Sequence, residues 1–441
     1  MKNFYDFYKL CKNPLYDDEV LKKILKAYRE IAKYNNSSDS FYRKIETIGT
    51  ENKKNTPPPQ KEKDLFWSAL FNRWKRNILR GKNISDKTYN GELRELVEAL
   101  RKTQDISTYN EFIEIIRKYP IIDKYKMIRS ESIDFEYREW NYVLSSNING
   151  TRELDLTPNY RLYINSEASD TYQILAGFIG ECSQEKIPYY LKFIEDPKDY
   201  PERADSIVIW ADEKTLFKYY RILNQLQKRM PNVISRCSEP PILTMKINSW
   251  IGFGEEPNSI EQSYTSARSK ILVESISNAL RTWIIENSEK KVNINKLNFP
   301  VKQYIAARSV KDGFDSMKKE IRTRPKSILS YGVNNSDLNR DLYIEILNDI
   351  IDDVIPAIES DDDSIDYNKN EKNLRFYFRN SLNDVLDFVM NSDVDRKLFF
   401  GKIRENIKQN SKKYGIDEEK FIFNDGYLEQ IKKRREDCER D

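Results

Sequence analysis

The stretch YYLKFIEDPKDYPERADSIVIW, residues 189–210, decides what kind of fold this chain can form. It contains two short apolar runs that are separated by a polar segment with two prolines, a pattern typical of two β-strands and their connection. Lys192 lies at the centre of the first run, and Arg203 follows just before the second. A lysine inside an apolar strand either extends its ammonium group to solvent or serves a function.

The period of a β-strand places alternate side chains on opposite faces of a sheet. In RLYIN, residues 161–165, the side chains of Arg161, Tyr163 and Asn165 share one face. In the run around Lys192, the lysine faces away from its apolar neighbours on both sides. If these strands pair, one face of the sheet carries Arg161, Tyr163 and Lys192 among aromatic residues. The pattern alone also fits a sheet edge where Lys192 reaches water.

The 441 residues are enough for two or three domains. Residues 1–150 and 301–441 show helical spacing of apolar residues, whereas residues 151–300 combine short β-like runs with helical segments. This order predicts an α+β fold, with a small mixed or antiparallel sheet in a central domain and helical regions on both sides. The clearest expected helices are 17–34, 65–79, 90–103, 109–118, 169–183, 213–229, 265–288, 339–358 and 395–410.

Composition excludes several classes of function. The chain has no histidine, which removes Ser-His-Asp and Cys-His catalysis and histidine-ligated metals. Its net charge is +3, and its four cysteines are widely spaced, so we expect no nucleic-acid partner and no zinc ribbon or disulfide framework. The sequence shows neither a signal peptide nor an apolar membrane-spanning stretch. We therefore expect a cytoplasmic protein without a membrane partner, although secretion by another route stays open.

Four sequence blocks resemble the HopA-type effector family, which also includes lyase-like proteins of ribosomal-peptide and lanthipeptide biosynthesis. They lie in the right order over about 155–290 and are RLYIN (161–165), the opening stretch with Lys192 and Arg203, PPILTMKINSWIGFGEEP (240–257) and SYTSARSKILVESI (263–276). That family in turn resembles the phosphothreonine lyases, which carry a Lys-x-His strand, a base lysine and a phosphate-binding arginine. The separation of the lysine and the arginine here is similar to that in the lyases.

The resemblance implies a role for individual residues. Lys192 occupies the place of the catalytic base, and Tyr163 takes the place of the lyases' histidine as a general acid. The implied phosphate ligands are Arg161, Arg203, Lys246 and Arg268. The implied supporting residues are Asn165, Trp210, Glu255 and Glu256, of which the two glutamates either orient cations or cap the following helix.

The implied reaction is β-elimination of phosphate from phosphoserine or phosphothreonine in a peptide or protein. It requires no metal and no cofactor. Lysine acts as a base only when burial or nearby cations lower its pKa from about 10.4. The apolar strand around Lys192 would do this, and arginines suit the departing phosphate because they bind its oxygens in pairs. No kinase motif is present, so a separate kinase is the expected partner.

Two departures from the family pattern keep other functions open. Ala267 stands where the family helix carries histidine, and Thr265 replaces a glycine. A non-catalytic phosphopeptide-binding protein, or an effector or scaffold with a HopA-like domain, is therefore the alternative. A helical structural protein with a vestigial lyase domain is the third reading.

Overall fold

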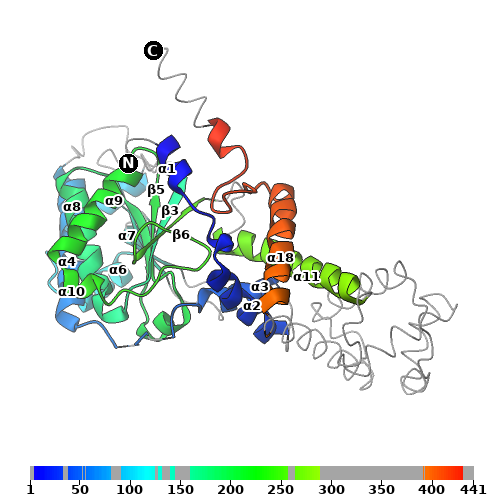
Figure 1. Cartoon of the computed structure of the whole chain (residues 1–441). Coiled ribbons are helices and arrows are strands. Elements are labelled where there is room, and N and C mark those ends of the chain that lie inside the picture. The colour runs from blue at the N-terminus through cyan, green and yellow to red at the C-terminus, as the bar shows by residue number, and fades with distance from the viewer. Residues whose placement is uncertain are drawn as a thin grey trace, which may run out of the picture. The chain divides into compact units, whose positions relative to one another are not determined.

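The computed structural model describes residues 4–32, 38–51, 53–54, 56–80, 91–124, 128–131, 140–144, 159–256, 264–288, 391 and 393–430. The chain divides into two compact units (Figure 1). One consists of Glu46–Asn258, and the other combines Met1–Ile45 with Ser259–Asp441. The expected division at 150 and 300 stays a prediction.

The unit Glu46–Asn258 is built on a seven-stranded sheet in the order β1-β2-β4-β5-β3-β7-β6. Every neighbouring pair of strands is antiparallel. The strands are β1 Ile128–Glu131, β2 Trp140–Leu144, β3 Tyr160–Ile164, β4 Tyr190–Ile194, β5 Ile207–Ala211, β6 Met245–Lys246 and β7 Ile251–Glu255. The α+β class is thus confirmed, and the sheet is antiparallel.

Strands β3, β4 and β5 form where the sequence predicted them. Strands β1 and β2 correct the expectation that residues 1–150 are helical throughout. The local pattern explains β2, since Trp140 and Tyr142 alternate with Asn141 and Val143 at the period of a strand. Strand β2 pairs with β4, so this missed element lies directly beside Lys192.

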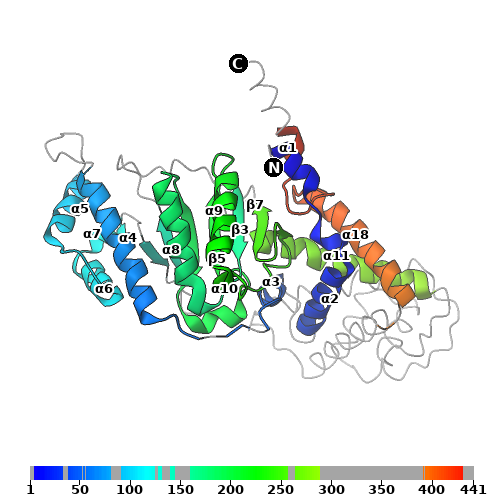
Figure 2. The same ribbon diagram turned by 60° about the vertical axis from the view of Figure 1, so that its left-hand side comes forward.

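Helices pack against one face of the sheet, which we call the helix-covered face (Figure 2). There the ring of Phe193 contacts Phe66 and Tyr172, with ring centroids 5.9 and 5.7 Å apart. Leu191 and Ile207 on the same face are fully buried. The helices of this unit are α4 Gln60–Arg80, α5 Gly91–Lys102, α6 Tyr109–Lys118, α7 Pro120–Lys124, α8 Ala168–Gln184, α9 Leu216–Arg229 and α10 Pro231–Ile234, with a 3-10 turn η2 at Pro197–Glu202.

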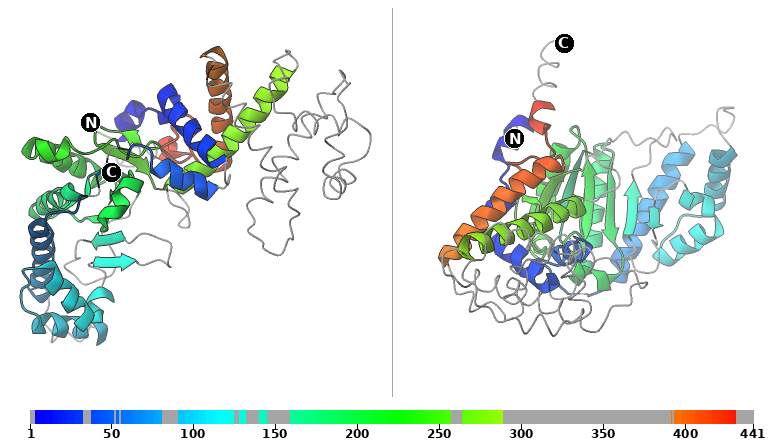
Figure 3. Two further views of the ribbon diagram at one scale, coloured as in Figure 1. Left: turned by 90° about the horizontal axis from the view of Figure 1, so that it is seen from below. Right: turned by 90° about the vertical axis from the view of Figure 1, so that its right-hand side faces the viewer.

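The other unit is helical in its described part. Its elements are α1 Phe4–Leu10, η1 Pro14–Tyr16, α2 Asp18–Ala32, α3 Ser38–Glu46 (whose last residue belongs to the sheet unit), α11 Tyr264–Ser288 and α18 Asp393–Lys413. Helices α11 and α18 lie side by side (Figure 3). The expected helices 17–34, 265–288 and 395–410 are present, whereas 339–358 lies outside the described residues. None of the described helices is long and apolar enough to cross a membrane.

Candidate functional site

The second face of the sheet carries the polar residues that the sequence singled out. Residues directly opposite each other in an antiparallel pair lie on the same face. One row across the strands consists of Tyr142, Lys192, Val208, Tyr163, Gly252 and Lys246. The next row consists of Leu144, Tyr190, Trp210, Arg161 and Gly254. Arg161, Tyr163 and Lys192 therefore share one face, as predicted, and we call it the charged face.

Lys192 is partly exposed, and its ammonium group lies over aromatic rings. Its Nζ is 3.9 Å from the ring centroid of Trp140 and 5.9 Å from that of Trp210. Burial of the charged end lowers the pKa of Lys192 to about 8. The positive charges of Arg203 and Arg161 act in the same direction, and the negative charge of Asp205 opposes them. A substantial fraction of Lys192 is consequently neutral near pH 8 and able to accept a proton.

Aromatic rings stack on one another on the charged face beside this lysine. Tyr190 and Trp210 stack with their ring centroids 4.2 Å apart, and Tyr142 stacks on Trp210 at 6.2 Å. Trp140 belongs to a buried cluster with Ile194. These packed rings fix the environment of Lys192, because large side chains in contact leave little freedom of movement. Trp210, one of the predicted supporting residues, is one of the rings close to the lysine, and its supporting role stays a prediction.

Arg203 lies in a buried network of carboxylates. Its Nε and Nη2 donate to the two oxygens of Asp205 at 2.8 and 3.0 Å, and Nη2 also donates to Glu46 at 2.7 Å. The Arg203 guanidinium is 4.7 Å from the ring centroid of Trp140, the same ring that Lys192 contacts. Arg203 holds the pKa of Asp205 below its usual value, although burial of this carboxylate acts in the opposite direction. The positive charge of Arg203 also lowers the pKa of Lys192.

Another lysine, Lys53, is buried and lies beside this network. Lys53 donates from Nζ to the backbone oxygen of Arg203 at 2.8 Å. Burial lowers the pKa of Lys53 to about 7, against the opposing negative charge of Asp205. Two lysines with lowered pKa values therefore lie near the same arginine–carboxylate network.

Arg161 forms a paired interaction with Glu256, in which its Nε and Nη2 each donate to a carboxylate oxygen. Glu256 follows β7 and is more exposed than the buried carboxylates around Arg203. Burial alone would lower the pKa of Arg161, but Tyr163 and Glu256 together raise it. Glu256, one of the two predicted supporting glutamates, is thus paired with a cation of the charged face. Tyr163 is buried and interacts with the same arginine.

Three other predicted residues of the sheet unit have contacts or positions outside this centre. Lys246 is exposed on β6 and forms an ion pair with Glu239 at 3.0 Å. Asn165 is fully buried and donates from Nδ2 to the backbone oxygen of Glu239 at 2.5 Å, so it holds a loop in place. Glu255 is opposite Tyr160 on the helix-covered face, away from Arg161.

Arg268 belongs to the other compact unit. It lies on α11, is fully buried, and donates from Nε to the backbone oxygen of Phe421 at 2.9 Å. Its guanidinium lies over the ring of Tyr264, 3.7 Å from the ring centroid. These contacts stabilise the packing of its own unit, and its predicted role as a phosphate ligand stays a prediction.

Four residues of the site were missed from the sequence, namely Trp140, Asp205, Glu46 and Lys53. A signal existed for Asp205, because it follows Arg203 by two positions and side chains at that spacing in extended backbone share a face. Trp140 was missed because strand β2 was missed. Glu46 and Lys53 lie more than 130 residues before their partners in the sequence, and no local pattern indicates either contact.

Comparisons with known proteins bear on the region of this site. Residues 137–312 match the family model described as the HopA1 effector protein family. Two solved structures, of effector proteins from Pseudomonas syringae pv. syringae strain 61 and pv. tomato strain DC3000, are similar at 12% and 14% identity with TM-scores of 0.32 and 0.30. Each covers 58% of this chain, over 87% and 88% of its own length. A comparison with curated proteins finds no match. The family match confirms the resemblance that the four sequence blocks indicated.

Proposed function

We propose, taking the match of residues 137–312 to the HopA1 effector family as the premise, that this chain is a phospho-Ser/Thr lyase. It would eliminate phosphate from a phosphorylated peptide or protein and leave a dehydroamino acid. A separate kinase would add the phosphate beforehand. The observation that carries the proposal is Lys192, a lysine with a pKa of about 8 whose Nζ lies 3.9 Å from the ring centroid of Trp140, on the same face as Arg161 and Tyr163.

In this mechanism neutral Lys192 removes the proton from Cα of the phosphorylated residue. The electron pair of the broken C–H bond forms the Cα=Cβ double bond, and the Cβ–O bond breaks. Tyr163 supplies a proton to the bridging oxygen as phosphate leaves. The step leaves the dehydroamino acid, inorganic phosphate, a protonated Lys192 and a deprotonated Tyr163, so it needs no oxidant or reductant. Transfer of a proton from Lys192 to Tyr163 through solvent restores both groups for the next turnover.

Arg161 is the better of the two arginines for contacting the phosphate. Its carboxylate partner Glu256 is more exposed than Glu46 or Asp205, so a phosphate displaces it with less disruption of buried charge. Arg203 would act mainly through Lys192, by disfavouring the ammonium form. Lys246 would attract the phosphate from the exposed edge.

A phosphopeptide-binding protein without turnover is the second candidate. It is favoured by Ala267, which lies on α11 where the family helix carries histidine. A protein that merely binds phosphate has no use for a lysine of lowered pKa, and this residue is the reason for ranking the lyase first.

The test is mass spectrometry of phosphoserine and phosphothreonine peptides incubated with the full chain. We expect loss of phosphoric acid and formation of an alkene that adds thiols. Lys192→Ala should lower the rate by about 10³-fold, within the usual contribution of a general base, and should leave phosphopeptide binding in place. The matched control is Lys198→Ala, which removes an exposed lysine of the same unit that the mechanism does not use.

The outcomes separate the two candidates. Release of phosphate that restores the hydroxyl group would mean hydrolysis and would contradict the mechanism. Binding that depends on Arg161, without any change of peptide mass, would favour the binding protein. Turnover that survives in Lys192→Ala would remove the assigned role of that residue.

A further inference from the structure

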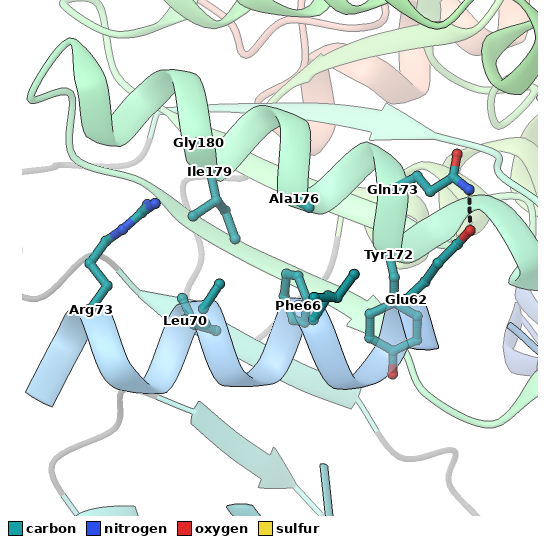
Figure 4. A pocket seen from close by; sticks show the side chains of 11 residues that line it. Glu62, Phe66, Leu70, Arg73, Tyr172, Gln173, Ala176, Ile179 and Gly180 are labelled. Atoms are coloured by element: carbon teal, nitrogen blue, oxygen red, sulfur yellow. Dashed lines mark hydrogen bonds between the residues drawn. The ribbon is translucent and has the colours of Figure 1, made fainter. Parts of the chain in front are cut away.

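A groove lies between α4 and α8, within the sheet unit and apart from the charged face (Figure 4). Its volume is about 200 Å³. Pockets for drug-sized molecules are usually about 300–1,000 Å³, so this groove suits a few apolar side chains better than a free small ligand.

Two helical stripes form the walls of the groove. On α4 the lining residues occupy positions 62, 65, 66, 69, 70 and 73, and on α8 they occupy 172, 173, 176, 179 and 180. This spacing is the pattern by which a helix presents one face to a neighbour. Leu65 is 59% exposed, which is unusual for leucine in a packed stripe. The exposed positions Leu65, Ala69 and Ala176 therefore border a space that no described element fills, above buried apolar side chains of both helices.

Small residues give the groove its depth. Ala69 and Ala176 are exposed, and Gly180 lies one turn beyond Ala176 on α8. A Cβ atom added at Gly180 would meet no atom within 4 Å. Small residues one turn apart let a third helix approach closely, because helix axes that pack through them need less separation.

The two ends of the groove carry opposite charges. One Glu62 oxygen accepts a hydrogen bond from Gln173, whereas the other is buried and has no hydrogen-bond partner among the described residues. At the other end, Arg73 donates to Ser183 Oγ at 2.5 Å. The glutamate and the arginine are separated along α4 by about three helical turns, or roughly 16 Å. A buried carboxylate oxygen without a donor favours a ligand that brings one.

We propose that this groove docks an amphipathic helix of about three turns from a partner polypeptide. A basic residue near the C-terminus of that helix would contact Glu62, and an acidic residue near its N-terminus would contact Arg73. The helix would run antiparallel to α4. In that orientation both charges also suit the dipole of the docked helix, and its apolar side chains fill the space over Ala69, Ala176 and Gly180. This inference does not depend on the proposed lyase activity.

The test uses fluorescence anisotropy with the full chain and a labelled peptide of about eleven residues. The peptide is built from alanine, with leucines at helical spacing, glutamate first and lysine last, and a second peptide exchanges the two charged ends. We expect the first peptide to bind and the exchanged peptide to bind about fivefold more weakly. Gly180→Leu, which fills the groove, should weaken the first peptide about tenfold or more. Circular dichroism checks that this variant folds, and Ala176→Lys replaces it if it does not.

Several outcomes would overturn the assignment. No binding by the wild type, or equal binding by wild type and Gly180→Leu, would show that the groove is no docking site. Equal binding of the two peptides would remove the roles of Glu62 and Arg73. A dimer of the full chain that dissociates in Gly180→Leu would mean that a second copy occupies the groove. Lys192→Ala should bind the peptide like the wild type, so a failure of the lyase proposal would not imitate a failure here.

Discussion

The two faces of the central sheet differ in how they are made stable. On the helix-covered face, Phe193 packs among aromatic rings and its neighbours are fully buried. On the charged face, the next residue along the same strand is Lys192, whose surroundings combine aromatic rings with two arginines and several carboxylates. The comparison shows a division of roles. Burial of the apolar face stabilises the fold, and this stability allows the other face to keep desolvated charges in a fixed geometry.

Adjacent substitutions on β4 should have very different effects if this division of roles is correct. Phe193→Ala should lower the free energy of unfolding by about 3–5 kcal/mol, because it opens a cavity under α4 and α8. Lys192→Met should change it by about 1 kcal/mol or less, because it removes a charge that burial disfavours. Urea denaturation followed by circular dichroism measures both values. Equal losses would mean that Lys192 is a structural residue.

Arg203 provides the strongest test on the charged face. Arg203→Met should lower the free energy of unfolding by about 3 kcal/mol, since it leaves Asp205 and Glu46 buried without their cation. Combining it with Asp205→Asn and Glu46→Gln should recover part of that loss. Urea denaturation of the single and triple variants measures both free energies of unfolding. A triple variant less stable than the single one would show that the carboxylates have other essential partners.

The rate of elimination should depend on pH through Lys192. The base form is neutral, and the pKa of Lys192 is lowered to about 8, so activity rises as pH increases through that value. We expect kcat/KM to rise about tenfold per pH unit below pH 8 and to level off above it. Initial rates on a phosphopeptide between pH 6 and 9 measure this profile. A flat profile below pH 8 would exclude Lys192 as the base.

The smallest effect is expected at the exposed edge of the charged face. Lys246 is exposed and pairs with the exposed Glu239. Lys246→Ala should change stability by less than about 0.5 kcal/mol and phosphopeptide affinity by about twofold. Salt dependence of binding is the more sensitive measurement, because long-range attraction is screened by ions. A loss as large as that of Arg161→Ala would place the phosphate at this edge instead.

The periodicity of the sequence was sufficient to predict which residues share the charged face of the sheet. It was not sufficient to predict which other residues contact them. The alternation in RLYIN and around Lys192 predicted correctly that Arg161, Tyr163 and Lys192 lie together. It did not reveal β2, whose short strand lies within a stretch assigned to helices. Because β2 was not predicted, Trp140 was not placed beside Lys192, and nothing indicated that the ammonium group contacts its ring.

The arginines show a similar limit. The family resemblance singled out Arg161 and Arg203, and both lie beside rings of the charged face, Arg161 at Trp210 and Arg203 at Trp140. The sequence did not indicate that Arg161 pairs with Glu256, or that Arg203 pairs with Asp205 and Glu46. The contacts with Glu256 and Glu46 depend on how segments distant in the chain meet. This difference changes which arginine is better suited to contact a phosphate.

The sequence by itself determined the α+β class, the three central strands and the face to which Lys192 belongs, because these follow from local periods and apolar runs. The tertiary structure decided the electrostatic state of the site. The pKa of Lys192 is set by burial of its ammonium group, which lies over the ring of Trp140, and by the nearby charges of Arg203, Arg161 and Asp205. Both effects depend on distances between segments that are far apart in the chain. Desolvation and Coulomb interactions act through space, so a linear pattern specifies the residue while the fold sets its chemistry.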